Sequence, residues 1–358
     1  MAERGHSVRV VQPVPRTPGP LSRGKYAEIA AMPKDEDRGV PVRRPRYWHI
    51  PSRAQGNAER FARRAMAELD RGPAPDVVVC DYAWPAAALA PALAERGLPC
   101  VVNGRGSDVL EVAGEAGLGD LLGSYLRAAG HWCAVSQDLV DAMDRVAGLP
   151  GNGVLVPNGV NTERFRPRDQ EAARRIVGVP TGLPLVLVVG HLIPRKDPLL
   201  ALDAFLAGAP PLAQLRFIGA GPLAEALESR IHSEGLQDRV ISLGERPPDE
   251  LAEHWYAACD LLLLTSSREG RPNVVLEALA SGRPVLATAA GGTAEILPEK
   301  RMLGASRNAA DLGAQLAELL ANPTAPAQLA ASVAGLSWSR SLETLEECLD
   351  QAMAKTRR

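Results

Sequence analysis

Short apolar runs that are typical of β-strands alternate with stretches that are typical of amphipathic helices along most of this sequence. Strands are expected at 8–11, 77–80, 100–103, 132–135 and 154–156, and again at 185–189, 215–218, 240–243, 261–264 and 285–287. Helices are expected at 57–70, 86–96, 118–129 and 138–146, and again at 199–206, 223–234, 249–258 and 274–281. Because strands that alternate with helices pair in parallel, the pattern predicts an α/β fold with two parallel sheets.

The composition fits two globular domains. The chain has 358 residues, of which 46% are hydrophobic and 23% charged, and that length is ordinary for two domains. No apolar run approaches the roughly 20 residues of a membrane-spanning helix, and no secretory signal precedes the first expected strand. We therefore expect a cytoplasmic protein, and we interpret its five dispersed cysteines as buried thiols. The six histidines lack metal-ligand spacing, so neither a metal nor a cofactor is expected.

Charge is unevenly distributed along the chain. Residues 1–64 contain fourteen Lys and Arg against six Asp and Glu, whereas the whole chain has a net charge of −2. Such a basic region favours an anionic acceptor or a peripheral position on the inner face of the membrane, although a solvated arginine-rich surface is the alternative. Nucleic acid is not expected as a partner, because the region lacks interleaved aromatic residues and any recognised binding motif.

Two carboxylates in the second half, Glu269 and Glu277, bracket a Gly/Pro/Asn turn and the first turn of an expected helix. An anion fits where the loop becomes helix, because the first N–H groups of a helix lack partners and face the positive end of its dipole. The two carboxylates could then bind groups on opposite sides of a diphosphate. That layout suits a nucleotide-sugar.

The motif Glu-Gly-x-x-x-Val-Val-Leu-Glu-Ala at 269–278, followed by Ser-Gly-x-Pro-Val at 281–285, resembles the E-x7-E signature of retaining GT-B-fold glycosyltransferases of family 4. Three further segments resemble that family in the expected order: the phosphate-contacting loop at 188–197, the Gly-x-Gly-Pro turn at 217–222 and the interdomain crossover at 156–161. The resemblance implies a GT-B architecture of two Rossmann-like domains. These are an acceptor-side domain at 1–163, onto which a C-terminal helix within 340–358 returns, and a donor-binding domain at 164–339.

The resemblance also implies a metal-independent hexosyltransferase that takes a UDP- or GDP-sugar as donor. The acceptor would be a glycan, a lipid-linked sugar or a small polyol. The closest likeness is to enzymes of cell-surface polysaccharide assembly, including the teichuronic-acid type. A nucleotide-sugar epimerase of GT-B-like fold, or a truncated nucleotide-binding remnant with little transfer activity, are the alternatives.

The donor-binding residues follow from the motifs. Lys196 would contact the pyrophosphate and stabilise its developing charge, Glu269 would bind the sugar ring, and Glu277 would bind the ribose. The remaining expected contacts to the donor come from His191, Arg195, Arg246, Gly270 and the backbone N–H groups of Asn273 and Val274. For each of these residues the alternative is a solvated charge or an ordinary turn.

Arg105 and Asp108 are the candidates on the acceptor side. Relatives place a histidine at the position of Arg105, and arginine cannot act as a general base. Arg105 could instead bind a diphosphate or an anionic acceptor and so take part in catalysis. Asp108 could orient Arg105 or a sugar hydroxyl, or it could cap the following segment.

The N-terminal domain is expected to lack its first strand and glycine-rich loop, because residues 2–6 resemble the end of a first helix. Residues 13–56, rich in Pro, Arg and Gly, are expected to form an irregular loop. The sequence does not identify the sugar, the base, the acceptor or the oligomeric state.

Overall fold

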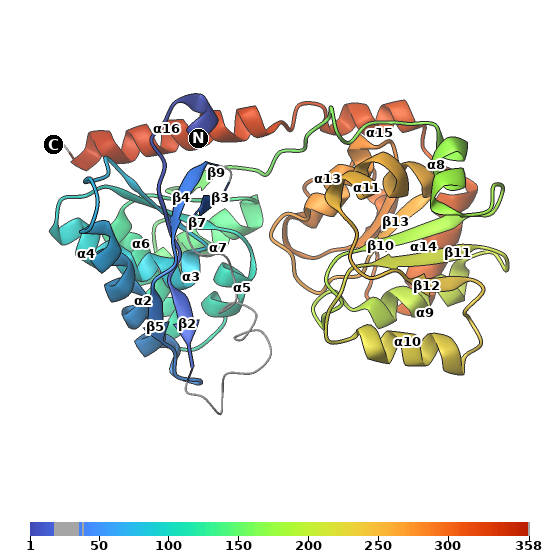
Figure 1. Cartoon of the computed structure of the whole chain (residues 1–358), viewed down its shortest axis with the longest axis horizontal. Helices are drawn as coiled ribbons and strands as arrows, with labels where there is room; N and C mark the ends of the chain where they lie inside the picture. Colours follow the sequence, from blue (N-terminus) through green and yellow to red (C-terminus); the bar gives the residue numbers. More distant parts are fainter. Residues whose placement is uncertain (18–35, 38, 357–358) are drawn as a thin grey trace. The chain divides into compact units, whose positions relative to one another are not determined.

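The computed structural model describes residues 1–17, 36–37 and 39–356. The chain divides into two compact units (Figure 1). Unit 1 comprises Met1–Val156 and Leu342–Arg358, and unit 2 comprises Pro157–Ser341. Each unit contains a parallel sheet with helices packed around it, so the predicted α/β fold with two Rossmann-like domains is confirmed.

Unit 2 is built on a six-stranded sheet in the order β12-β11-β10-β13-β14-β15, in which every ladder is parallel. Its strands are β10 (Leu185–Val189), β11 (Gln214–Ile218), β12 (Val240–Ser242), β13 (Leu261–Leu264), β14 (Val285–Thr288) and β15 (Leu303–Gly304). All four residues of β13 are buried. Such a continuous apolar run suits a strand that is covered on both faces.

Helices cover the two faces of this sheet. They are α8 (Gln170–Val177), α9 (Pro198–Gly208), α10 (Ala224–Ser233), α11 (Pro248–Glu250), the π-helical turn η4 (Leu251–Trp255), α12 (Tyr256–Ala258), α13 (Asn273–Ala280), α14 (Ala309–Ala321) and α15 (Pro326–Val333). Figure 1 shows α9 and α10 on one side of the sheet and α8, α11 and α13 on the other. Two short 3₁₀ turns, η5 (Gly291–Thr293) and η6 (Lys300–Met302), precede β15.

The strand order of unit 2 reverses between β10 and β13. From β10 the chain builds β11 and β12 outward on one side, then returns to place β13 against the other side of β10 and continues to β14 and β15. Loops that leave the carboxyl ends of β10 and β13 therefore diverge to opposite faces of the sheet. Ligands of open α/β sheets bind in the crevice that forms at such a switch point.

Unit 1 contains a four-stranded parallel sheet, β6 (Val78–Asp81), β7 (Cys100–Gly104), β8 (Trp132–Ala134) and β9 (Val154–Leu155). Its helices are α2 (Ala54–Leu69), α3 (Ala83–Ala86), η3 (Ala87–Leu89), α4 (Ala90–Glu95), α5 (Ser107–Ala113), α6 (Leu118–Ala129) and α7 (Gln137–Ala147). The final helix, α16 (Trp338–Thr356), packs Cys348, Leu349 and Ala352 against β7 and β8. All five cysteines are buried free thiols.

The prediction of an irregular loop at 13–56 is wrong where the structure describes that stretch. After η1 (Ala2–Arg4) and β1 (Val10–Val11) come β2 (Val14–Arg16), β3 (Glu36–Asp37), β4 (Val40–Arg43) and β5 (Arg46–Trp48). They form two small sheets, β1-β4-β3 and β2-β5. Strands of two to four residues are too short to show an alternating pattern. In addition, β1 and β2 pair with the distant β4 and β5, and only β3 and β4 form a local hairpin. Residues 18–35 and 38 lie outside the described part of the chain.

Two expected helices are divided. The predicted 86–96 helix is split into η3 and α4, which begins at Ala90, and the predicted 249–258 helix contains the π-helical turn. In unit 1 no described strand joins β1 to β6, and the expectation of a missing first strand stays a prediction.

Candidate functional site

The loops after β10 and β13 bring together Lys196 and Glu269, which the sequence analysis expected to contact the pyrophosphate and the sugar ring of the donor. Lys196 lies in the loop that follows β10, and Glu269 lies in the loop that follows β13. Because the two strands are neighbours and parallel, both loops open at the same edge of the sheet, at the switch point. The predicted donor side therefore coincides with the place where this fold binds ligands.

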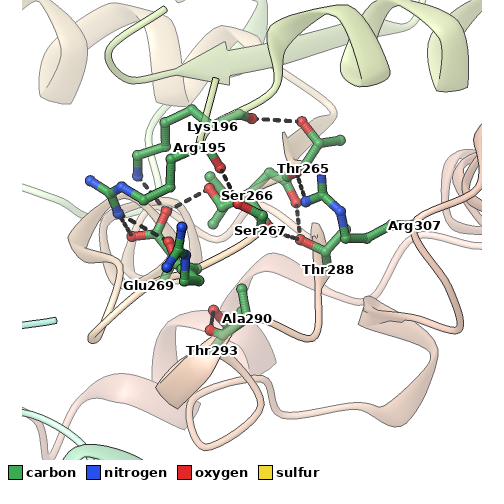
Figure 2. Close-up of polar contacts among 12 residues, drawn as sticks. Arg195, Lys196, Thr265, Ser266, Ser267, Glu269, Thr288, Ala290, Thr293 and Arg307 are labelled. Atoms are coloured by element: carbon green, nitrogen blue, oxygen red, sulfur yellow. Dashed lines mark hydrogen bonds and ion pairs between the residues drawn. The ribbon is translucent and has the colours of Figure 1, made fainter. Parts of the chain in front are cut away.

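Lys196 and Glu269 form an ion pair at this edge (Figure 2). The Lys196 Nζ lies 2.5 Å from Oε1 of Glu269, and the Ser266 hydroxyl donates to the same oxygen at 2.5 Å. Arg195 Nη1 lies 3.6 Å from the other oxygen, Oε2. Glu269 is only 6% exposed, and a buried carboxylate needs such partners because an unpaired one would be costly to desolvate.

Hydrogen bonds hold the Lys196 loop against the Glu269 loop. The Thr265 hydroxyl bonds to the carbonyl oxygens of Lys196 and Asp197 at 3.0 and 2.9 Å, and Ser267 N donates to Arg195 O at 2.8 Å. Arg307 contacts both loops, donating to Thr265 O at 2.6 Å and to Asp197 Oδ2 at 2.7 Å. Figure 2 shows this set of contacts around the two loops.

Asp197 adopts the left-handed backbone conformation, with φ of 50°. Residues other than glycine rarely adopt this backbone conformation, and those that do are concentrated at functional sites. Its side chain also caps α9 by accepting from Leu200 N. This conformation is therefore held by the contacts of Asp197 with Leu200 N, Arg307 and Thr265.

The Gly270-to-Val274 segment leads directly into α13. Gly270 is buried, Asn273 is exposed and Val274 is half-buried. Pro272 precedes the helix, and no side chain caps it. Val275 N donates to Pro272 O at 3.1 Å, and the expectation that the N–H groups of Asn273 and Val274 bind an anion stays a prediction.

Glu277 is half-buried on α13 and is bound from another element. The hydroxyl of Tyr256 donates to Glu277 Oε2 at 2.8 Å. Burial raises the pKa of Glu277, while this hydrogen bond and the charge of Arg164 oppose the rise. The Glu277 carboxylate is therefore hydrogen-bonded and half-buried, and it is not a fully solvated charge on the surface of the helix.

The remaining donor-side candidates lie nearer the surface. His191 is exposed in the loop after β10. Arg246 lies after β12, where its Nε is 3.4 Å from Glu250 Oε1. Close packing explains the glycine at position 219 of the Gly-x-Gly-Pro turn. A Cβ there would lie 2.0 Å from Gly190 O, because the two loops approach each other backbone to backbone.

In unit 1 the carboxyl ends of β6 and β7 carry a second polar cluster. Arg105 Nε donates to Asp81 Oδ1 at 2.9 Å, and Asn103 Nδ2 donates to the same oxygen at 2.8 Å. The Arg105 side chain is 38% exposed. The Tyr82 hydroxyl lies 2.8 Å from Ser107 Oγ.

Asp108 is turned into the backbone of unit 1. Its carboxylate accepts from the N–H groups of Ala83, Arg105 and Gly106 at 2.5, 3.0 and 2.6 Å, and the residue is 3% exposed. Burial raises the pKa of Asp108 to about 6, against the effect of these backbone donors. Asp108 thus fixes the turn that presents Arg105.

Sequence reasoning missed Ser266, Tyr256 and Arg307. Ser266 lies three residues before Glu269 in the same loop, and this closeness in sequence could have identified it as a contact of Glu269. Tyr256 and Arg307 come from elements distant in sequence, so nothing in the pattern connects them to the site. Among the described residues no group of three or more His, Cys, Asp or Glu could hold a metal ion. None of the described helices is long and apolar enough to cross a membrane.

Two family models match the chain. Residues 1–164 match the model described as Glycosyltransferase Family 4, and residues 169–333 match the model described as Glycosyl transferases group 1. Together with the two parallel sheets described above, these matches show that the chain is a glycosyltransferase. The chain belongs to the family 4 glycosyltransferases and has the GT-B fold.

Curated relatives support the same class. A protein of Bacillus subtilis described as a candidate teichuronic acid biosynthesis glycosyltransferase, TuaC, is 28% identical over 312 residues, covering 84% of this chain and 76% of the relative. A D-inositol 3-phosphate glycosyltransferase of Geodermatophilus obscurus is 34% identical over 218 residues, covering 57% of this chain and 48% of the relative. The chain thus matches about half the length of the second relative.

Solved structures share the fold at low identity. A sucrose-phosphate synthase from Thermosynechococcus elongatus has a TM-score of 0.77 at 20% identity, covering 99% of this chain and 91% of that one. HepE of Anabaena, solved in complex with UDP, has a TM-score of 0.72 at 21% identity, covering 87% of each chain.

Proposed function

We propose that this chain is a retaining glycosyltransferase that moves a hexose from a UDP- or GDP-sugar. The observation that most supports this is the meeting of Lys196 and Glu269 at the switch point, beside the start of α13. Glu277 follows Asn273 by four residues, about one helical turn. HepE of Anabaena, which shares the fold, is solved with UDP, and this favours UDP among the candidate leaving groups.

Lys196 and the first turn of α13 stabilise the departing nucleoside diphosphate. The ammonium group of Lys196 has three N–H donors, so it can keep its bond to Glu269 and also donate to a phosphate oxygen. The backbone N–H groups of Asn273 and Val274 add the positive end of the helix dipole. Arg195 and His191 supply further donors at the same edge. Because these groups provide the compensating charge, we propose that transfer is independent of a metal.

The two glutamates recognise opposite ends of the donor. Glu269 accepts hydrogen bonds from hydroxyls of the sugar, and Glu277 accepts from the ribose. Gly270 lets the donor approach the backbone closely, since it has no side chain. Arg246 lies in the segment that follows β12, where it can contact the base.

Transfer occurs at the face of the sugar from which the diphosphate leaves. The acceptor hydroxyl oxygen forms a bond to the anomeric carbon as the bond from that carbon to the β-phosphate oxygen breaks. The leaving phosphate oxygen takes the hydroxyl proton, so no separate general base is needed and the configuration is retained. Arg105, held by Asp81 and by the turn that Asp108 fixes, binds an anionic group on the acceptor or the diphosphate.

Two acceptor classes are favoured by the relatives. TuaC is described as acting in teichuronic acid biosynthesis, which favours a glycan or lipid-linked acceptor of cell-surface polysaccharide. The D-inositol 3-phosphate glycosyltransferases favour a small phosphorylated polyol. Both classes carry negative charge, for which the guanidinium of Arg105 is suited.

We also propose that unit 1 associates peripherally with the inner face of the membrane. Trp48 and Ile50 are 54% and 44% exposed, and the Arg16 guanidinium lies 4.9 Å from the centre of the Trp48 ring. Exposed aromatic side chains beside arginines suit the interface of an anionic bilayer. Trp48→Ala should reduce co-sedimentation with vesicles containing phosphatidylglycerol and leave nucleotide binding unchanged. Equal sedimentation of variant and wild type would refute the proposal.

Calorimetric titration with UDP, GDP and ADP tests the donor, followed by assay of nucleotide release with each acceptor class. Chelator should leave the rate unchanged, and the product linkage should keep the configuration of the donor. Conversion of the donor sugar without acceptor would reveal an epimerase instead. Binding of nucleotide without transfer to any acceptor would support the nucleotide-binding remnant.

A further inference from the structure

Tyr256 contacts Glu277 although the two residues belong to different elements. Tyr256 begins α12, before β13, whereas Glu277 lies in α13, after β13. Tyr256 is fully buried, and its hydroxyl donates to Glu277 Oε2 at 2.8 Å. Burial raises the pKa of Tyr256 well above its usual value, so the phenol stays protonated and donates throughout the neutral range. One carboxylate oxygen of Glu277 is therefore engaged by a fixed donor.

The Tyr256 ring is in turn held by the segment that enters unit 2. The Phe165 ring meets it edge to face, with centroids 5.8 Å apart and an interplanar angle of 74°, and Phe165 is 8% exposed. Edge-to-face pairs of this kind are favourable beyond the area that they bury. The ring therefore has little freedom to turn its hydroxyl away from Glu277.

Arg164 completes this arrangement. Its guanidinium lies 5.7 Å from the centre of the Phe165 ring and pairs with Asp249 at 2.6 Å. The same segment reaches the start of α13, where Asn158 Nδ2 donates to Asn273 Oδ1 at 2.9 Å. Residues 158–165 thus contact α13 directly at its first residue, and through Tyr256 at Glu277.

We propose that Tyr256, held by Phe165, is a positioning residue that fixes the rotamer of Glu277 and thereby sets selectivity for the ribose of the donor. With Oε2 engaged by Tyr256, the other oxygen, Oε1, is left to accept from a ribose hydroxyl. A carboxylate that is held in place loses less side-chain entropy when it binds. This inference rests on the proposed function, which assigns the ribose to Glu277.

The test compares binding of UDP with binding of 2′,3′-dideoxyuridine diphosphate, which lacks both ribose hydroxyls. Calorimetry is carried out on the full chain as wild type, Tyr256→Phe, Glu277→Gln and the double variant. Tyr256→Phe keeps the ring and removes only the hydroxyl. Tyr125→Phe, a change of the same kind in unit 1, is the control, and the melting temperature of each variant is recorded.

For Tyr256→Phe we expect the Kd for UDP to rise about tenfold, in line with a hydrogen bond to a charged group, and the Kd for the dideoxy nucleotide to change little. The preference for ribose should therefore shrink. Because Tyr256 acts through Glu277, the double variant should bind UDP as Glu277→Gln does. Phe165→Leu should weaken the ribose preference in the same direction, which provides a second route if Tyr256→Phe folds poorly.

If Tyr256 had only a structural role, Tyr256→Phe would weaken binding of both nucleotides equally, and that result would overturn the inference. An unchanged ribose preference in Tyr256→Phe would overturn it as well. If Glu277→Gln kept the full ribose preference, the assignment of Glu277 in the proposed function would be wrong, and this inference with it. Failure of the wild type to bind any nucleoside diphosphate would instead refute the proposed donor.

Discussion

The Nζ of Lys196 lies 2.5 Å from Oε1 of Glu269, although the two residues are 73 positions apart in the chain. The parallel pairing of β10 with β13 brings them together, because it aligns the carboxyl ends of the strands that precede each residue. The pair is also tied to Ser266, which donates to the same oxygen. We therefore expect Lys196, Glu269 and Ser266 to act as a unit, whose substitution effects are not additive.

Lys196→Ala should lower kcat about a hundredfold while raising the KM for the donor less, because the phosphate charge that Lys196 meets is largest in the transition state. Steady-state kinetics with the donor identified by calorimetry measures both constants. Lys300→Ala, at an exposed lysine in the same unit, is the control. A raised KM with unaltered kcat would show that Lys196 binds ground state and transition state equally.

Glu277→Gln should weaken binding of the nucleoside diphosphate by about 1.5–3 kcal/mol, the usual worth of hydrogen bonds to a charged group. The amide oxygen of glutamine can still accept from Tyr256, so the helix and its packing should be preserved. Calorimetry gives the affinity, and the thermal midpoint without ligand checks the fold. Unchanged affinity would remove the ribose assignment.

Ser266→Ala should affect both stability and turnover. Ser266 is fully buried, and removal of its hydroxyl leaves Glu269 with the contact to Lys196 and the longer one to Arg195. We expect a loss of about 1–2 kcal/mol in the free energy of unfolding of unit 2, and a rise in the KM for the donor as Glu269 gains freedom. Ser332→Ala, at an exposed serine of α15, is the control, and denaturation in urea with steady-state kinetics gives both quantities. Wild-type values for both would show that Ser266 does not hold Glu269.

The sequence predicts the core of unit 2 well because its strands carry a strong local signal. The runs 185–189 and 261–264 are continuously apolar, and they match β10 and β13. The pairing of β10 with β13 is a property of the strand order, which no local pattern encodes.

The features that the sequence analysis did not predict depend on contacts formed only in the folded chain. Strands β2 to β5 are two to four residues long, and β2 and β5 pair with each other across a long stretch of chain, whereas β3 and β4 form a local hairpin. No local pattern marks Tyr256 as part of the site, because its hydroxyl meets Glu277 only after the chain has folded. Asp108 was expected to orient Arg105 or a sugar hydroxyl, or to cap the following segment, whereas its burial and three backbone donors depend on the turn after β7 meeting Ala83.

The pH dependence of unit 1 should report on Asp108. Burial raises the pKa of Asp108 from 3.8 to about 6, so the folded state binds the proton more tightly than the unfolded state does. The stabilising contribution is then fully present below pH 3.8 and is lost as the pH rises through 6. Two pKa units correspond to about 3 kcal/mol.

Asp108→Asn cannot titrate, and its amide oxygen can still accept from the backbone of the turn. The difference in unfolding free energy between wild type and Asp108→Asn should therefore shift against the wild type by up to about 3 kcal/mol between pH 4 and pH 7. Urea denaturation at several pH values in this window measures that difference, and other carboxylates cancel in the comparison. The opposite slope would mean that the N–H groups of Ala83, Arg105 and Gly106 outweigh burial. Folding would then favour the carboxylate anion of Asp108 over its protonated form, and the turn that carries Arg105 would be stabilised by that anion.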